Sequence, residues 1–173
     1  RLLRPANFPT GAPGSGHIVV KTRAGDSVGV INAMGRVFMA PLDNPFVVIR
    51  DEIAAVREQA PIILVDFHAE ATSEKIAMGW HLDGQVTAVV GTHTHVQSAD
   101  NRVLPGGTAY ITDVGMTGPH KSVIGAQKEA VIQQFLDRMP TRFEPATEDV
   151  KLCGVIVDVD NATGRARSIK RLR

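Results

Sequence analysis

Two apolar runs, each leading directly to histidine, constrain the fold more than any other feature of the sequence. Residues 61–65 read Pro-Ile-Ile-Leu-Val and lead to His68, while residues 86–90 read Val-Thr-Ala-Val-Val and lead to His93 and His95. Short continuous runs of β-branched residues, bounded by polar turns, are typical of strands that are buried on both faces. Sites in open α/β sheets lie at the carboxyl ends of such strands. The sequence therefore predicts a site where these three histidines meet.

The order of predicted elements indicates a mixed sheet. Strands are expected over residues 17–22, 28–33, 62–65, 86–90, 108–112, 150–159 and 165–171. Helices are expected over residues 45–59, 72–82 and 126–138, after a loop that covers residues 1–15. Hairpins thus lie at both ends, with strand–helix alternation between them. This order favours an α/β fold with a mixed sheet, or two sheets with helices outside, in a single domain of residues 1–173.

Helical spacing also predicts which helix faces are turned toward the core. The first helix is expected to begin at Pro45, with Asp43 or Asn44 as its cap. The apolar face of the helix at 72–82 contains Ile76, Ala77 and Trp80. The apolar face of the helix at 126–138 contains Val131, Ile132, Phe135 and Leu136. We expect both faces to pack inward.

Composition excludes several classes of function. The net charge is +1, so a general nucleic-acid or membrane binder is not indicated, and the basic stretch 165–173 is expected to be a solvated edge strand. No apolar run approaches the roughly 20 residues that a membrane-spanning helix needs, so we expect a cytoplasmic protein. The single cysteine, Cys153, has no partner for an internal disulfide. It lies in an apolar strand, where a buried and inert thiol is expected.

The histidines can be interpreted in more than one way. His93 and His95 are two residues apart, and on a regular strand both side chains would point to one face. Imidazole is a common ligand for zinc, manganese, iron and copper, so His68 from a neighbouring strand would complete a set of three nitrogen donors. Two structural histidines in a turn are the alternative to a metal site. A mononuclear zinc hydrolase built on the three histidines also fits this spacing.

Polar residues around the histidines are candidates for supporting the ligands or the substrate. These candidates are Asp66, Glu70, Thr94, Asp113, Gly115 and Thr117. A carboxylate beside a ligating histidine can fix its tautomer, although Glu70 can equally cap the following helix. The glycine-rich turn from Gly115 to Gly118 either binds phosphate or is simply tight.

Three motifs resemble one known family. Residues 65–75 (VDFHAEATSEK), 91–100 (GTHTHVQSAD) and 112–119 (TDVGMTGP) are similar to those of YmdB-like metallophosphoesterases, in the calcineurin-like phosphoesterase superfamily. The flanking residues 4–9 and 158–172 match as well. The resemblance implies a four-layer α/β/β/α sandwich with mixed sheets and a dinuclear metal site. Relatives in this family are described as 2′,3′-cyclic-nucleotide 2′-phosphodiesterases, and some act on cAMP.

The resemblance also implies roles for individual residues. His68 and His93 would bind one metal and His95 the other, with iron or manganese as the expected ions. A hydroxide between the two metals would attack phosphorus in line, and the metals would stabilise the developing charge. The expected substrate is a small phosphoester, such as a cyclic nucleotide, and the expected assembly is a homo-oligomer. No specific nucleic acid and no membrane is expected as a partner.

The sequence departs from the family at its beginning. Family members are longer and start with a block that carries an Asp in a Gly-Asp motif, a bridging Glu and an Asn in Gly-Glu-Asn, and an Asn-His pair whose His is the general acid. Gly25-Asp26 is a Gly-Asp pair, but it lies in a predicted hairpin turn. The chain also begins at Arg1, in a segment that reads like a connection between elements.

We therefore expect the C-terminal two-thirds of a metallophosphoesterase domain, with its N-terminal strands missing. No catalytic residue is expected in this chain, only the histidine half of a dinuclear site, and little or no activity in isolation. The absent strands would leave an apolar edge that favours self-association. The alternative is a non-catalytic oligomerising or binding remnant of the fold.

Overall fold

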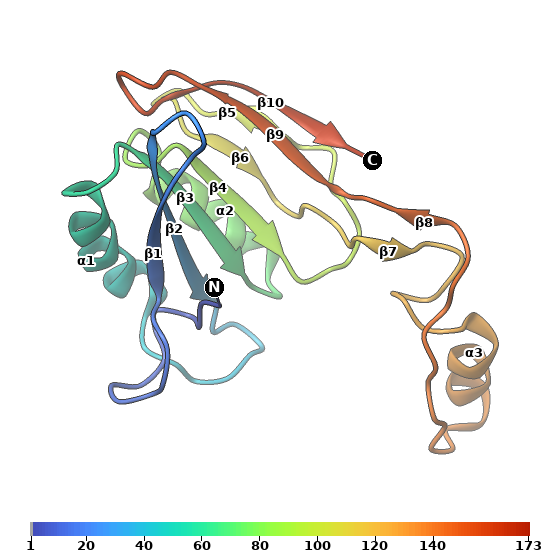
Figure 1. The fold of residues 1–173 in the computed structure, drawn as a ribbon. Coiled ribbons are helices and arrows are strands. Elements are labelled where there is room, and N and C mark those ends of the chain that lie inside the picture. Colours follow the sequence, from blue (N-terminus) through green and yellow to red (C-terminus); the bar gives the residue numbers. More distant parts are fainter. Residues whose placement is uncertain (1) are drawn as a thin grey trace.

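A mixed sheet forms the centre of the structure (Figure 1). Its six strands are β1 (His17–Lys21), β2 (Ser27–Met34), β3 (Ile62–His68), β4 (Ala88–Thr92), β5 (Arg102–Val103) and β6 (Ala109–Ile111). They lie in the order β1-β2-β3-β4-β6-β5, with β2, β3, β4 and β6 parallel and the edge strands β1 and β5 antiparallel. This computed structural model describes residues 2–173. The predicted mixed α/β sheet is confirmed.

Two helices cover one face of this sheet. Helix α1 (Pro45–Arg57) begins as predicted, because the Asn44 side chain accepts a hydrogen bond from the Phe46 N–H at 3.1 Å and Pro45 takes the first helical position. Its inner residues pack on alternate residues of β3, whose other side chains point to the opposite face. Successive side chains of β3 point to opposite faces of the sheet, and both faces are covered. The sequence of β3 is therefore apolar at nearly every position.

Helix α2 (Thr72–His81) packs through a different face from the predicted one. Ile76, Ala77 and Trp80 are exposed, whereas the buried residues are Glu74, Lys75, Met78 and Gly79. Two contacts decide this orientation. Lys75 forms an ion pair with the buried carboxylate of Asp113, which lies just after β6, and a Cβ at Gly79 would lie 2.5 Å from the ring of Tyr110. The apolar spacing within residues 72–82 indicates neither of these contacts. The predicted inner face of α2 is therefore wrong.

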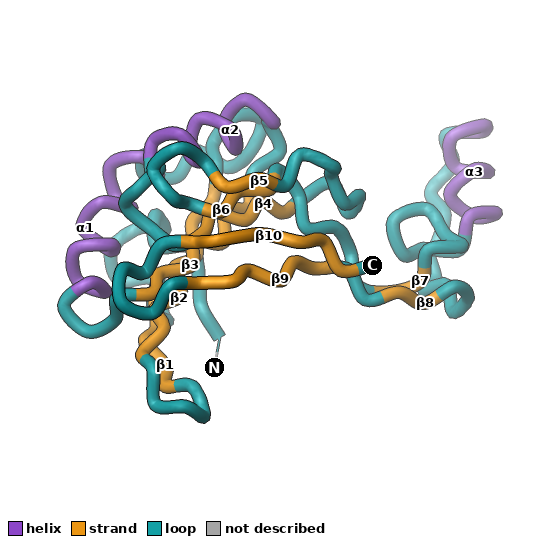
Figure 2. Tube along the Cα trace, turned by 90° about the horizontal axis from the view of Figure 1, so that it is seen from above, coloured by secondary structure: helices purple, strands orange, loops and turns teal. Residues whose placement is uncertain are grey.

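A hairpin covers the other face of the sheet (Figure 2). Strands β9 (Gly154–Val159) and β10 (Ala166–Leu172) pair antiparallel, and Ala166 and Ile169 pack against Ala88, Ala109 and Ile111. The predicted single strand over 150–159 is divided into β8 (Val150–Lys151) and β9. The two helices, the sheet and the hairpin beneath it therefore form three layers. The fourth layer of the expected sandwich stays a prediction.

Residues 120–149, which we call the arm, project away from the sheet (Figure 1). The arm joins β7 (Gly118–Pro119) to β8 and contains helix α3 (Lys128–Asp137). The β7–β8 pair lies at its base, and an isolated bridge joins Ala126 to Pro145 within it. The predicted inner face of α3 is wrong, because only Val131 is buried while Ile132, Phe135 and Leu136 are exposed. No helix within residues 2–173 has the length and apolar character to cross a bilayer.

Candidate functional site

The site begins with a hydrogen-bonded chain across the ends of two neighbouring strands. His68 ends β3 and lies opposite Thr92, which ends β4. The Nδ1 of His68 lies 3.0 Å from the Thr92 hydroxyl, and that hydroxyl donates to Oδ1 of Asp66 at 3.4 Å. A hydroxyl that donates to a carboxylate accepts from its other neighbour, so Nδ1 of His68 carries the proton. Its Nε2 is then a free electron-pair donor.

A second imidazole faces that donor. The Nδ1 of His93 lies 3.2 Å from Nε2 of His68, with the two rings edge to face. Burial, assisted by the neighbouring His93, lowers the pKa of His68 and favours its neutral form. Two nitrogen ligands on one ion, each about 2.0–2.1 Å from it, are roughly 3.0–3.4 Å apart. The observed separation and the neutral donor therefore fit a shared metal ion.

His93 and His95 reach the site by a loop rather than along a strand. Strand β4 ends at Thr92, and the two histidines have φ angles of 133° and 65°, values that non-glycine residues rarely adopt. The expectation that both lie on one strand face is wrong, although both line the same hollow. Such conformations cost about 1–3 kcal/mol each and persist where the surroundings impose them.

Asp113 imposes the loop conformation. Its carboxylate accepts hydrogen bonds from the backbone N–H groups of Thr94 and Gly115, each at 2.9 Å. Thr94 lies between the two histidines, so this carboxylate fixes the segment that carries both. Asp113 is almost completely buried and forms an ion pair with Nζ of Lys75 at 3.2 Å. The ammonium group compensates the buried negative charge, so helix α2 supports the histidine loop through one side chain.

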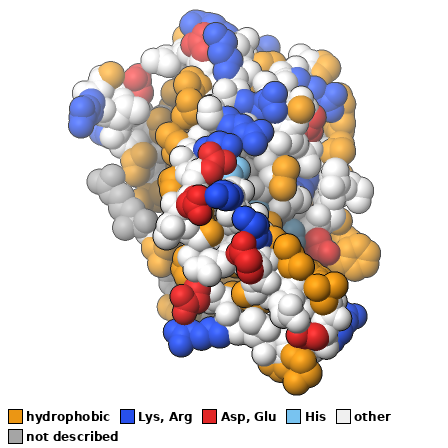
Figure 3. Space-filling view, turned by 90° about the vertical axis from the view of Figure 1, so that its right-hand side faces the viewer, with side chains coloured by type: hydrophobic (Ala, Val, Ile, Leu, Met, Phe, Trp, Pro, Cys, Tyr) orange, Lys and Arg blue, Asp and Glu red, His pale blue; other side chains and the backbone are white. Residues whose placement is uncertain are grey.

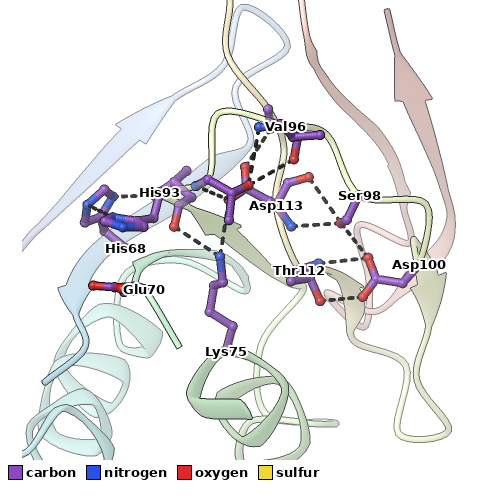
Figure 4. Close-up of polar contacts among 12 residues, drawn as sticks. His68, Glu70, Lys75, His93, Val96, Ser98, Asp100, Thr112 and Asp113 are labelled. Carbon is purple, nitrogen blue, oxygen red and sulfur yellow. Dashed lines mark hydrogen bonds and ion pairs between the residues drawn. The ribbon is translucent and has the colours of Figure 1, made fainter. Parts of the chain in front are cut away.

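A second carboxylate holds the far end of the same loop (Figure 4). Asp100 accepts from the Ser98 hydroxyl at 2.6 Å, from the Thr112 N–H at 3.1 Å and from the Thr112 hydroxyl. Burial opposes ionisation of Asp100, but these hydrogen bonds prevail and lower its pKa. Residues 93–100 are therefore tied at both ends to the segment that follows β6.

The histidines line a hollow with a volume of about 190 Å³. Its lining residues are His68, Thr92, His93, His95, Asp113, Gly115 and Met116. Larger hollows lie beside α1 and α2, and between the sheet and β9, but no histidine lines either. Small-molecule sites usually exceed about 300 Å³. The histidine hollow therefore suits a phosphate-sized group rather than a whole nucleotide.

The structure places some of the predicted supporting residues at the site and others away from it. Asp66 contacts His68 through the Thr92 hydroxyl. Thr94 takes part through its backbone N–H, which donates to Asp113. Glu70 is exposed and does not line the hollow, and helix α2 begins at Thr72 with Ala71 as its N-cap and no side-chain capping bond, so the predicted capping role is wrong. Thr117 lies outside the hollow, where its hydroxyl donates to the Cys153 carbonyl at 3.1 Å.

The three-histidine metal site stays a prediction. Among residues 2–173, no group of three or more His, Cys, Asp or Glu side chains is arranged to hold a metal ion. His68 and His93 are in contact, while His95 lines the same hollow beside them. The described residues thus provide a two-nitrogen donor pair with a third imidazole nearby.

Three important residues were not singled out from the sequence. Thr92 and Asp100 lie within the Gly91–Asp100 motif, and Lys75 ends the Val65–Lys75 motif. Lys75 sits on the helix side that the apolar pattern assigned to solvent. Its partner Asp113 lies 38 residues away along the chain, so no local sequence signal indicates this ion pair.

Comparison with known proteins identifies the family. A sequence profile described as YmdB-like protein matches residues 1–172. The chain belongs to the YmdB-like protein family. It is 53% identical over 171 residues to a Bacillus subtilis (strain 168) protein named 2′,3′-cyclic-nucleotide 2′-phosphodiesterase, a match that covers 99% of this chain and 64% of that protein.

Solved structures of similar proteins share the fold. A hypothetical protein from Thermus thermophilus superposes with a TM-score of 0.89 at 41% identity, over 98% of this chain and 65% of that one. A Mycoplasma pneumoniae protein described as a novel phosphatase gives a TM-score of 0.87 at 39% identity, over 99% and 62%. The chain thus spans a little under two thirds of the length of these relatives.

Proposed function

We propose that this chain carries the histidine half of a metal-dependent phosphoesterase site that hydrolyses small phosphoesters, cyclic nucleotides among them. The observation that carries the proposal is the 3.2 Å approach of His68 Nε2 and His93 Nδ1 beside the carboxyl ends of the parallel strands β3 and β4. The names of the relatives, a cyclic-nucleotide phosphodiesterase and a phosphatase, support phosphoester hydrolysis as the chemistry.

The side chains have distinct tasks in this proposal. His68 and His93 hold a divalent ion, iron or manganese, with His95 directed to a second ion of a complete site. When bound, the ions stabilise the negative charge that develops on the phosphoryl oxygens. Thr92 and Asp66 keep Nε2 of His68 unprotonated. Asp113 and Lys75 fix the loop that carries the other two histidines.

The described residues supply too few carboxylates for two metals. Two close dications repel strongly, and a bridging anion is needed to offset that repulsion. Asp113 is the only carboxylate that lines the described hollow, and its oxygens are already engaged by Lys75 and two backbone N–H groups. We therefore propose that residues 1–173 form the C-terminal two-thirds of a metallophosphoesterase domain. The remaining ligands and the general acid would come from its other part, so this chain alone has little or no activity.

A non-catalytic binding remnant is the second candidate. The finding that favours it is the lack of a three-ligand group among residues 2–173. This candidate predicts no metal binding at the histidine pair, whereas the first predicts that the pair binds one ion per chain. Metal binding at named residues therefore separates the two.

The test is titration of the chain with Mn²⁺ by calorimetry, followed by assay of 2′,3′-cyclic AMP hydrolysis. We expect weak binding that His68→Ala and His93→Ala each abolish. His17→Ala is the matched control, because His17 pairs with Glu52 and does not line the hollow. Binding that survives in both site variants, or no binding at all, would exclude the proposed site. Metal-dependent turnover near that of the Bacillus subtilis relative would contradict the incomplete site.

A further inference from the structure

Residues 35–43, which we call the β2–α1 loop, lie at the end of the sheet where β3 and β4 finish (Figure 1). Strand β2 is parallel to β3, and its last residue pairs with His68. The Gly35 N–H then donates to the His68 carbonyl at 2.9 Å. Further along the loop, Sδ of Met39 accepts from the Glu70 N–H at 3.3 Å. The loop is therefore attached to the segment that carries the first histidine of the site.

Two buried side chains fix the conformation of the β2–α1 loop. Asn7 is completely buried, and its amide donates to backbone carbonyls at the two ends of the loop, at 2.8 and 2.9 Å. The buried carboxylate of Glu74 accepts from the backbone N–H groups of Arg36 and Val37, at 3.0 and 3.3 Å. Most residues of the loop are exposed, yet its backbone is held at the start, at the end and on the way.

This fixed loop presents one aromatic ring to solvent. Phe38 is 83% exposed, more than any other aromatic side chain among residues 2–173. Its φ angle is 61°, in a region where a bulky residue is an outlier. Val37 and Met39 line the hollow beside α1 and α2, whereas Phe38 does not, so packing does not explain this conformation. Strained residues held in place by their surroundings cluster at ligand sites.

The histidine hollow leaves most of a nucleotide without contacts. Its volume of about 190 Å³ suits a phosphate, so an attached nucleoside would lie on the adjoining surface. Figure 3 shows the side of the molecule on which the arm projects, where Lys and Arg alternate with Asp and Glu. Such a mixed surface does not select a base by charge. An aromatic face selects bases by stacking, because every base has a π-face.

We propose that Phe38 is the surface on which the base of a nucleotide stacks while its phosphate occupies the histidine hollow. This role rests on the proposed function and narrows its substrates from small phosphoesters to nucleotides. Purines should bind better than pyrimidines, since the larger ring system stacks over more area. The fixed backbone contributes as well, because a ring that is already positioned loses little conformational freedom when the base binds.

Calorimetric titration with 2′,3′-cyclic AMP and with methyl phosphate, each with and without Mn²⁺, tests the proposal. Methyl phosphate is a phosphoester without a base. We expect Phe38→Ala and Phe38→Leu to raise the Kd of 2′,3′-cyclic AMP about tenfold, and Phe38→Trp, which keeps a flat ring, to change it by less than about twofold. The Kd of methyl phosphate should stay the same in all three variants.

Phe135→Ala is the matched control, because Phe135 has a similar exposed fraction, 72%, but lies on α3 in the arm. It should leave both Kd values unchanged. Far-UV circular dichroism and urea unfolding should be the same for Phe38→Ala and wild type, because the Phe38 ring is exposed.

Two results would overturn the stacking role. One is 2′,3′-cyclic AMP that binds wild type no more tightly than methyl phosphate does, or that binds Phe38→Ala and wild type equally well. The other is a parallel loss of both ligands in Phe38→Ala, which would show that the loop shapes the hollow instead. Failure of the proposed function looks different. Nucleotide binding that needs neither Mn²⁺ nor His68, yet is weakened by Phe38→Ala, would contradict the metal site and support the stacking role.

Discussion

Replacing Lys75 by methionine isolates the contribution of the buried ion pair beneath the histidine loop. Methionine keeps the apolar stem but removes the ammonium group, so Asp113 is left buried without its counter-charge. The Lys75 side chain is fully buried and that of Asp113 is 3% exposed, so water does not replace the lost partner. Breaking a buried pair in this way costs about 3–5 kcal/mol.

The expected loss lies near the lower limit of that range. Two backbone N–H groups still donate to Asp113, and each such bond to a charged group stabilises it by about 1.5–3 kcal/mol. We therefore expect a loss of about 3 kcal/mol in the free energy of unfolding. For a domain of this size the Tm should fall by about 6–12 °C. Urea and thermal unfolding at neutral pH, followed by circular dichroism, measure both quantities.

Lys121→Met is the matched control. Lys121 pairs with Glu148 at 2.7 Å, but both side chains are more than half exposed, and such surface pairs contribute little to stability because water solvates both charges. Adding Asp113→Asn to Lys75→Met should recover part of the lost stability, because it removes the unpaired charge. A Lys75→Met variant that unfolds as the Lys121→Met control does would show that the buried ion pair does not stabilise the fold.

Three further changes test other parts of the site. Gly91→Ala should lower the free energy of unfolding in urea by about 1–3 kcal/mol, because its Cβ would lie 1.8 Å from the Thr112 carbonyl oxygen. Gly154→Ala is the control, and it should change stability by less than about 0.5 kcal/mol because the space around Gly154 is open. Because the pKa of Asp100 is lowered from 3.8, its contribution to folding stability is complete above that pH and is lost as the pH falls below it. Asp100→Asn should therefore lose less stability than wild type between about pH 5 and pH 2, and an equal dependence of unfolding free energy on pH in the two proteins would count against this role. Thr92→Val removes the hydroxyl that orients the imidazole at the end of β3, so calorimetry should show Mn²⁺ affinity reduced by about 10–100-fold with the fold retained, and unchanged affinity would exclude the orienting role.

Strand positions could be predicted because burial on two faces leaves a continuous apolar run. The run before His68 and the run before His93 both became central strands, and their carboxyl ends met as expected. The capped start of α1 could be predicted as well, because Asn44 and Pro45 act on their immediate neighbours. These signals are local, so the sequence contains them directly.

Helix faces could not be predicted, because their partners are distant in the sequence. The buried side of α2 depends on Asp113 and Tyr110, which lie about thirty or more residues away along the chain. The apolar side of α3 faces outward because the arm carries it away from the sheet. Periodicity shows that a helix has an apolar side, but it does not show what that side contacts.

The proximity of His68 and His93 could be predicted from the sequence, but the route by which His93 reaches His68 could not. His68 and His93 do meet, yet the second histidine arrives through a positive-φ loop that Asp113 fixes, and strand geometry gives no account of that loop. The roles of Thr92 and Lys75 follow from contacts between strands and between helix and sheet. Such contacts exist only once the chain has folded.

The central claim is that the imidazoles of His68 and His93 share a metal ion. The most direct measurement is anomalous diffraction from a crystal of the chain soaked in Mn²⁺. We expect a peak between His68 Nε2 and His93 Nδ1, at about 2.0–2.2 Å from each nitrogen. Manganese bound only elsewhere, or the two imidazoles remaining in direct hydrogen-bond contact in the presence of Mn²⁺, would contradict it.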